Sequence, residues 1–87
     1  MIFVINRAWS PEATEEATYE ATRGFWRVGA ETRARTVYAL GVAGGVVRGA
    51  YRIESWHRGG EEGRWGFIGS PAPDLRVVGT SIERLAP

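Results

Sequence analysis

A glycine pair between two β-rich segments constrains the fold of this chain more than any other feature. Residues 36–43 are rich in β-branched and aromatic side chains, Gly44 and Gly45 follow, and residues 46–53 return to a similar composition. Consecutive glycines adopt the positive φ angles that a tight β-turn requires. The sequence therefore predicts a β-hairpin over residues 36–53, and we expect it to form the centre of a sheet.

A helix is predicted ahead of this hairpin, between Ser10 and Gly24. Serine caps the free amides of a first turn, and Pro11 suits the first helical position. Arg23 and Gly24 supply a matching charge and cap at the other end. Alanines recur every four residues and predict a narrow face that lies against the sheet. These alanines are Ala13, Ala17 and Ala21.

The remaining segments predict further strands and a second, short helix. A buried strand is expected at residues 2–6, and further strands at residues 25–28, 64–69 and 75–78. A helical turn is expected at residues 31–35. A polar loop is expected at residues 55–63, and a weak final turn or strand at residues 79–87. Trp65 shares a strand face with Phe67, so its indole is assigned to the core.

The order of these elements defines a fold class. A strand, a helix, a short strand, a long hairpin and later strands describe an α+β protein with a strongly curved, mostly antiparallel sheet. Twelve glycines fit the bends and bulges by which such a sheet closes on itself. We therefore expect a single domain over residues 1–87, built as a small pseudo-barrel with an N-terminal helix and a second short helix.

Composition excludes several classes of protein. There is no cysteine and His57 is the only histidine, so the sequence offers no disulfide framework and no metal site, and no cofactor is predicted. The first apolar run is too short for a signal peptide, and no run approaches the roughly 20 residues that span a bilayer. We expect a cytoplasmic protein without a membrane partner.

The basic residues favour a nucleic-acid partner through their type and their distribution. All eleven are arginine, whose planar guanidinium group forms forked hydrogen bonds with phosphates and base edges. The net charge is only +1, yet residues 30–58 carry five arginines against two glutamates. A GC-rich genome also favours arginine codons, and it is the stronger explanation for the absence of lysine. The basic middle of the chain is therefore the more informative feature, and DNA and RNA fit it equally.

Four tryptophans are more than a core of this size normally needs, so one or two are expected to line a surface or pocket. Trp26 follows the predicted helix cap and stands beside Arg27, where a short strand would turn its ring toward a cleft. Trp9 and Trp56 lie next to loops and are the other candidates for base binding. For any single tryptophan a core position is the favoured alternative. Asn6 either bonds a base edge or caps a turn, and the turn is favoured.

Arginines on the return strand of the hairpin are candidates for contacts with a nucleic-acid backbone. Arg48 and Arg52 are four positions apart, so we expect them on one strand face with small residues between them. Arg27 is the third candidate. An ordinary solvated face, paired with Glu54 or Glu31, is an alternative of equal weight.

Catalysis has little support in the sequence. His57 stands beside Trp56, but no partner nucleophile is evident. Glu61 and Glu62 lie on one loop and cannot form the opposed carboxylates that glycoside hydrolysis requires. The glycine-rich stretch 41–45 lacks the lysine of a phosphate-binding loop. We expect a protein that is not an enzyme, and a small hydrolase or nuclease using His57 is the last-ranked alternative.

Over half of the chain resembles a widespread domain of uncharacterised bacterial proteins, sometimes found beside nuclease modules, in which a helix leads into a Gly-x-Trp-Arg element. The segments that carry the resemblance are Ala21–Arg27, Tyr38–Val42, Gly45–Arg48, Tyr51–Ile53, Trp56 and Arg64–Gly69. The likeness implies a nuclease as a further candidate partner.

More distantly, the order of elements is similar to that of the PUA-like superfamily, which includes the EVE, YTH and ASCH domains. In EVE and YTH readers, a Gly-x-Trp element after an early helix precedes a β-hairpin, and its tryptophan helps to cage a modified or flipped base. Gly24, Phe25 and Trp26 form the matching element here. The resemblance therefore implies that Trp26 is one wall of a base cage, and position alone offers Trp56 as a second wall.

Two functions follow from these observations. The leading hypothesis is a nucleic-acid-binding module that receives a base between Trp26 and either Trp9 or Trp56, while arginines contact the backbone. The alternative is a protein-interaction or accessory domain of a restriction or phage-linked system, in which the same aromatic side chains form an association surface.

Overall fold

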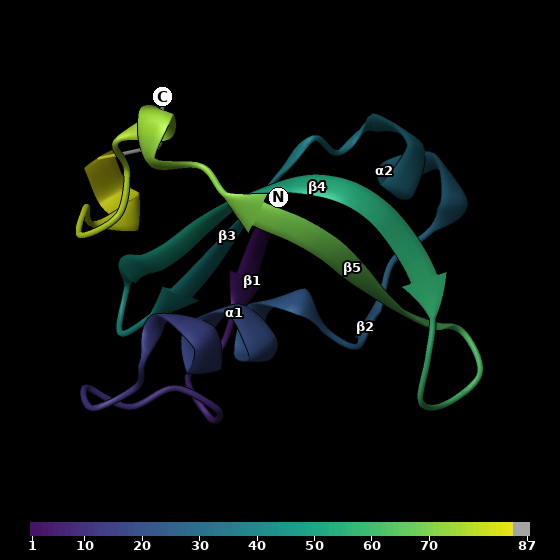
Figure 1. Cartoon of the computed structure of the whole chain (residues 1–87), viewed down its shortest axis with the longest axis horizontal. Helices are drawn as coiled ribbons and strands as arrows, with labels where there is room; N and C mark the ends of the chain where they lie inside the picture. Colours follow the sequence, from purple (N-terminus) through teal and green to yellow (C-terminus); the bar gives the residue numbers. More distant parts are fainter. Residues whose placement is uncertain (85–87) are drawn as a thin grey trace.

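A single five-stranded sheet organises the molecule. The computed structural model describes residues 1–84. In chain order the elements are β1 (Ile2–Val4), α1 (Glu15–Arg23), β2 (Trp26–Arg27), α2 (Ala30–Arg35), β3 (Tyr38–Ala43), β4 (Val46–Arg58), β5 (Arg64–Pro71) and two 3-10 helices, η1 (Pro73–Leu75) and η2 (Ile82–Arg84). The strand order is β1-β3-β4-β5-β2, and β1–β3 is the parallel pair (Figure 1). The predicted α+β class with a curved, mostly antiparallel sheet is confirmed.

The central hairpin forms as the glycine pair predicts. Gly44 and Gly45 have φ angles of 59° and 73°, and Ala43 pairs with Val46 on either side of them. Two residues with positive φ form the turn whose twist matches that of the flanking strands. β3 and β4 therefore lie side by side at the middle of the sheet, with β1 beyond β3 and β5 beyond β4.

β4 is the long, bent strand around which the sheet curls (Figure 1). Its register skips Arg48 in the pairing with β3 and Glu54 in the pairing with β5, so each of these is the extra residue of a β-bulge. A bulge bends its strand and increases the local twist. The predicted loop over residues 55–63 is wrong in its first half, because residues 55–58 continue β4 and pair with β5.

Helix α1 begins later than the sequence predicts. Its N-cap is Thr14, whose Oγ1 accepts a hydrogen bond from the Ala17 amide at 3.0 Å. The carbonyl of Ser10 accepts instead from the Ala13 amide at 2.9 Å, which closes a separate turn before the helix. Gly24 is the C-cap, as expected.

The buried residues of the α1 face that packs on the sheet are threonines, and of the predicted alanine face only Ala21 packs against the core. Thr18 and Thr22 are buried, whereas Ala17 is exposed. Each buried hydroxyl donates to the carbonyl four residues earlier, at 3.0 Å for Thr18 and 2.7 Å for Thr22, so no hydroxyl is buried without a partner. Gly41 permits this close approach, because a Cβ at that position would lie 2.2 Å from Thr22 Oγ1.

The core lies inside the curl of the sheet. It contains Phe3, Ile5, Val28, Ala39, Ala43, Tyr51 and Phe67. β1 and β2 stand at opposite ends of the strand order, yet the rings of Phe3 and Trp26 have centroids 5.0 Å apart. The curl therefore brings the two edges of the sheet toward each other across the core. Trp65 does not belong to the core cluster, which corrects its sequence assignment.

The first predicted strand and the strand predicted at residues 75–78 depart from the sequence prediction. β1 is an edge strand with Ile2 and Val4 exposed and Phe3 buried, so it is not buried on both faces as expected. The strand predicted at residues 75–78 does not form, because residues 73–75 are η1 and the chain then turns. Residues 79–82 hydrogen-bond to the start of β4 instead. The last part of the predicted final turn, residues 85–87, lies outside the described residues.

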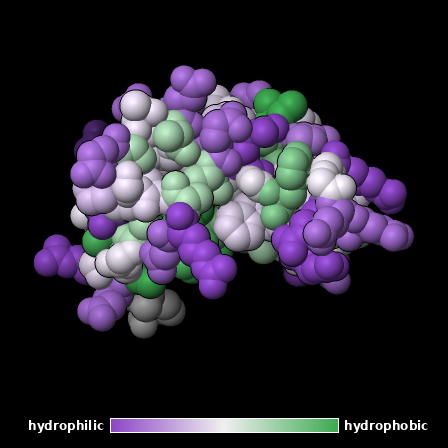
Figure 2. Space-filling view, turned by 90° about the horizontal axis from the view of Figure 1, so that it is seen from below, coloured by the Kyte–Doolittle hydropathy of each residue, from purple (hydrophilic) through white to green (hydrophobic). Residues whose placement is uncertain are grey.

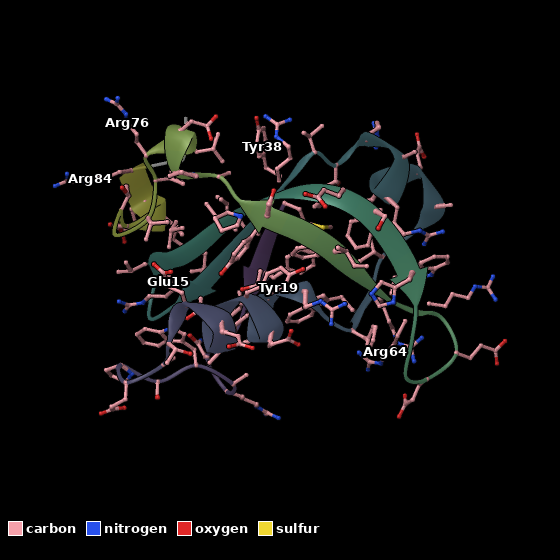
Figure 3. The ribbon with its side chains drawn as sticks, in the orientation of Figure 1. Glu15, Tyr19, Tyr38, Arg64, Arg76 and Arg84 are labelled. Carbon is pink, nitrogen blue, oxygen red and sulfur yellow. The ribbon has the colours of Figure 1, made fainter. Side chains whose placement is uncertain are left out.

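Side chains of α1 cover the part of β5 that β2 leaves unpaired. Arg23 Nε donates to the carbonyl of Phe67 at 3.0 Å, and Tyr19 Oη accepts from the amide of Gly69 at 3.0 Å. Figure 3 shows Tyr19 reaching from the helix toward the strand. Covering an edge in this way removes a template for unwanted strand pairing, and it fixes the helix beside the cavity described next.

Candidate functional site

A cavity of about 1000 Å³ lies between α1, the first half of β4 and residues 71–79. Trp9, Tyr19 and Tyr51 supply aromatic walls, and Pro71 and Val77 contribute to the opposite wall. The volume and the aromatic lining are typical of sites that receive a small planar molecule or one residue of a polymer. This cavity is the best candidate for a binding site among the described residues.

Trp9 and Arg48 form a stacked pair in the cavity wall. The Cζ atom of Arg48 lies 4.2 Å from the centroid of the Trp9 ring. Each partner is held separately, because Arg48 Nε donates to the carbonyl of Ala43 at 3.0 Å and Trp9 Nε1 donates to Thr18 Oγ1 at 3.2 Å. The terminal nitrogens of Arg48 have no hydrogen-bond partner among residues 1–84 and remain available to a ligand.

The bulge in β4 explains how Arg48 reaches this position. Arg48 is the residue that the β3–β4 register skips, so it leaves the strict alternation of the strand. Arg52 keeps its register opposite Tyr38, donates to the Tyr38 hydroxyl at 2.7 Å and lies over that ring at 4.9 Å. The predicted shared face of Arg48 and Arg52 is therefore replaced by two separate arginine–aromatic pairs, and only that of Arg48 lines the cavity.

Tyr51 places an unpaired hydrogen-bond donor in the cavity. The residue is 5% exposed, and its hydroxyl has no hydrogen-bond partner among the described residues. The hydroxyl lies over the backbone of Gly49, where a Cβ would come within 2.4 Å of it. Burial, with smaller contributions from Glu15 and Tyr19, raises the pKa of Tyr51 to about 12. The phenol is therefore protonated at neutral pH and can donate to an acceptor in the cavity.

Charges of both signs flank the cavity. Glu15 and Glu16 lie in the first turn of α1, on one side, and Arg48 lies on the other. Arg76 also belongs to the lining, but Figure 3 shows its guanidinium group projecting away from the sheet. The site therefore offers acceptors from the helix side and donors from Arg48 and Tyr51.

The structure leaves two of the predicted base-binding tryptophans outside this cavity. Trp26 stacks on Phe3, and its Nε1 donates to the carbonyl of Thr22 at 2.8 Å. Trp56 packs edge-on against Phe67, with ring centroids 5.8 Å apart. Trp9 alone of the three lines the cavity. The three indoles therefore do not share one cavity, and the contacts of Trp26 and Trp56 are those of side chains that pack on the core.

Asn6 and Arg27 also lie away from the cavity. Asn6 Oδ1 accepts from the amide of Gly44 at 2.9 Å and so ties the end of the first strand to the hairpin turn. This is the turn-capping role that the sequence favoured. Arg27 lies on β2, where its register partner is Arg64.

The ring of His57 is hydrogen-bonded by Arg23, at the C-terminal end of α1. Arg23 Nη2 donates to His57 Nε2 at 2.8 Å. A guanidinium group only donates, so this ring nitrogen accepts and the imidazole proton is on Nδ1. Nδ1 lies 3.4 Å from the carbonyl of Arg58, consistent with that tautomer. The nitrogen that a general base would need is therefore occupied by an arginine.

Sequence reasoning missed Tyr51 and the wall formed by residues 71–79. The alternation of a strand puts Tyr51 on the same side as the buried Val47, but nothing in the local sequence indicates an unpaired hydroxyl. The wall folds back from the far end of the chain through hydrogen bonds such as Gly79 N to Val47 O at 2.8 Å. Such non-local contacts leave no periodic signal.

Comparison of the chain with protein-family models, with curated proteins and with solved structures found no match. The resemblance to PUA-like domains therefore stays a prediction. No helix within residues 1–84 is long and apolar enough to cross a membrane. The same residues contain no group of three or more histidine or acidic side chains placed to hold a metal ion.

Proposed function

We propose that this protein is a nucleic-acid-binding module that takes one unpaired base into the cavity beside Trp9. The observation that carries the proposal is the unpaired, protonated Tyr51 hydroxyl in a cavity walled by the Trp9–Arg48 pair. This is the function that the resemblance to base readers predicts, with a different set of residues. Trp9 takes the role that the resemblance gave to Trp26.

The chemistry of a nucleobase fits what the cavity offers. A base has two flat apolar faces and an edge that carries both acceptors and amino donors. The aromatic and aliphatic walls suit the faces, and the Tyr51 hydroxyl with the terminal nitrogens of Arg48 suits the acceptors. The Glu15 carboxylate suits an exocyclic amino group. Stacking on an aromatic side chain contributes about 1 to 3 kcal/mol per base.

An unpaired base is the appropriate substrate, because the edge that this site would read is covered in a duplex. A base inside a stack must be flipped before it enters a pocket, which costs a few kcal/mol, about as much as one stacking contact returns. Single-stranded DNA or RNA avoids that cost. We therefore expect single strands to bind more tightly than duplexes of the same sequence.

The test is fluorescence anisotropy with labelled single-stranded and duplex DNA and RNA at low salt, with plain and modified bases. Tyr51→Phe removes only a hydroxyl, and Arg48→Gln removes a charge and the stacked guanidinium. Each is expected to weaken single-strand binding about fivefold to tenfold, since one hydrogen bond contributes roughly 1 kcal/mol. Their matched controls are Tyr38→Phe and Arg52→Gln, which alter the other arginine–aromatic pair, between β3 and β4, and should leave binding unchanged.

Two results would contradict this proposal. The first is the absence of binding by wild-type protein to every oligonucleotide at low salt. The second is an equal loss of affinity in the cavity variants and in the Tyr38 and Arg52 controls.

A protein segment is the second candidate occupant of the cavity. The wall formed by residues 71–79 is largely apolar, and Val78 within it is 57% exposed. An apolar peptide from a partner, such as a nuclease, would also fill such a space. If the wild-type protein binds no nucleic acid but Val78→Asp abolishes a complex with a partner protein, the interaction function replaces base recognition.

A further inference from the structure

Four arginines from four different elements lie at the end of β5 opposite to the cavity, and two of them contact Trp65. They are Arg27 on β2, Arg33 on α2, Arg58 on β4 and Arg64 on β5. The Cζ atoms of Arg33 and Arg58 lie 3.6 Å and 5.4 Å from the centroid of the Trp65 ring. We call these five residues the Trp65 surface. The indole is half-buried and positions the guanidinium groups of Arg33 and Arg58 through cation–π contacts.

Two of the four arginines are fixed by hydrogen bonds within the protein. Arg33 Nη1 donates to the carbonyl of Val28, and Arg64 Nη1 donates to the carbonyl of Phe25 at 3.3 Å. Arg27 and Arg58 are exposed, and neither has a hydrogen-bond or ion-pair partner through its side chain among residues 1–84. The surface therefore combines two anchored guanidinium groups with two that are free to contact an anion.

The placement of Arg27 opposes the stability of the sheet. Arg27 and Arg64 are direct register partners in the antiparallel β2–β5 pair. Like charges at directly opposed positions destabilise a pair of strands. Arg58 is the register partner of Trp65, the next residue of β5 after Arg64, so a third positive charge lies at this end of the sheet. A bound anion at Arg27 and Arg64 would relieve their repulsion, and burial of the Arg27 side chain offers no comparable gain because Arg27 is exposed.

Acidic residues near this surface do not neutralise it. Glu61 lies 3.7 Å from Arg64 Nε, and Glu62 follows it in the β4–β5 loop. Glu31 is 3.9 Å from Arg35, which is not part of the surface. Four positive charges at this end of the sheet therefore stand against two negative charges in the β4–β5 loop. In Figure 2, the end of the molecule where Figure 1 places the β4–β5 loop is predominantly hydrophilic, and Figure 3 places Arg64 beside this loop.

We propose that the Trp65 surface binds the phosphodiester backbone of a single-stranded nucleic acid, with Arg27 and Arg58 contacting phosphates. This inference rests on the proposed function and adds a second contact region to it. Exposed guanidinium groups on separate strands suit an anion with several spaced charges, and repeated phosphates provide that spacing. Base recognition and backbone binding are then located at different ends of β5.

The experiment compares the double variant Arg27→Gln, Arg58→Gln with the double variant Arg7→Gln, Arg84→Gln. Both variants lose two exposed arginines and have the same net charge. The probes are labelled oligothymidylate and oligouridylate, titrated at several salt concentrations. The first variant is expected to bind roughly tenfold more weakly at low salt and to lower the salt slope by about 1.4, since each phosphate contact in a single strand contributes about 0.7. The control should bind as the wild type does.

An unchanged salt slope in the Arg27 and Arg58 variant, or an equal loss in the control, would overturn the inference. Competition with inorganic phosphate separates two sources of the anion. If millimolar phosphate displaces the oligonucleotide from wild type but not from the Arg27 and Arg58 variant, the site is one for free phosphate and the backbone proposal fails.

Failure of this inference is distinguishable from failure of the proposed function. Tyr51→Phe removes no charge, so it should weaken binding without changing the salt slope. If only the Arg27 and Arg58 variant loses affinity, the Trp65 surface stands and base recognition in the cavity fails. If only Tyr51→Phe loses affinity, the cavity stands and the Trp65 surface fails.

Discussion

Tyr51 couples packing to protonation at the scale of a single residue. Its folded-state pKa of about 12 lies above the ordinary value of 10.0, so folding favours the neutral phenol. The resulting stability is fully present below pH 10 and is lost as the pH rises through 12. The Tyr51→Phe variant has no group to ionise at this position. Between pH 10 and pH 12 the unfolding free energy of the wild type should therefore fall relative to that of the variant.

Urea unfolding monitored by tryptophan fluorescence at a series of alkaline pH values measures that difference. Tyr38→Phe is the control, because its hydroxyl accepts from Arg52 and lies outside the core cluster. A difference between wild type and Tyr51→Phe that stays constant across this alkaline range would show that folding does not raise the pKa of Tyr51.

At the scale of elements, local chemistry predicted much and tertiary contacts decided the rest. The glycine turn, the Gly24 cap and the short helix α2 were predicted from residues that act within a few positions of themselves. The start of α1 was not, because Ser10 and Thr14 are both good caps and only the fold selects between them. The bulge at Arg48 was also missed, since it depends on how β4 pairs with β3. Without that bulge, the alternation of side chains along β4 places Arg48 on the same face as Arg52, and not against Trp9.

The cap of α1 gives a prediction at this scale. Thr14→Ala should reduce the free energy of unfolding by about 1 kcal/mol, because the Ala17 amide loses its acceptor. Ser10→Ala should change stability by less than about 0.5 kcal/mol, as expected of an exposed residue outside the helix. Chemical denaturation followed by circular dichroism compares the two variants. A larger loss in Ser10→Ala would place the functional cap where the sequence alone placed it.

At the scale of the whole molecule, the curl of the sheet determines which tryptophans bind and which pack. Strand order alone separates β1 from β2, and the two are brought together only when the bulges in β4 bend the sheet. Trp26 then meets Phe3 across the core and donates its N–H to Thr22. The sequence placed Trp26 correctly after the helix cap, but it could not show that the opposite edge of the sheet would cover its ring.

This arrangement separates the structural and binding roles of the indoles. Trp26→Ala should cost about 3 kcal/mol of stability, at the lower end of the range for a large aromatic because the side chain is only half-buried. The less disruptive Trp26→Phe should lose about 1 kcal/mol, since it keeps a ring and removes the hydrogen bond to Thr22. Neither substitution touches the cavity, so the folded protein should retain wild-type affinity for single strands. Trp9→Phe should show the reverse, with weaker binding and a smaller loss of stability. Reduced affinity in Trp26→Phe at unchanged stability would return Trp26 to the role of a cage wall.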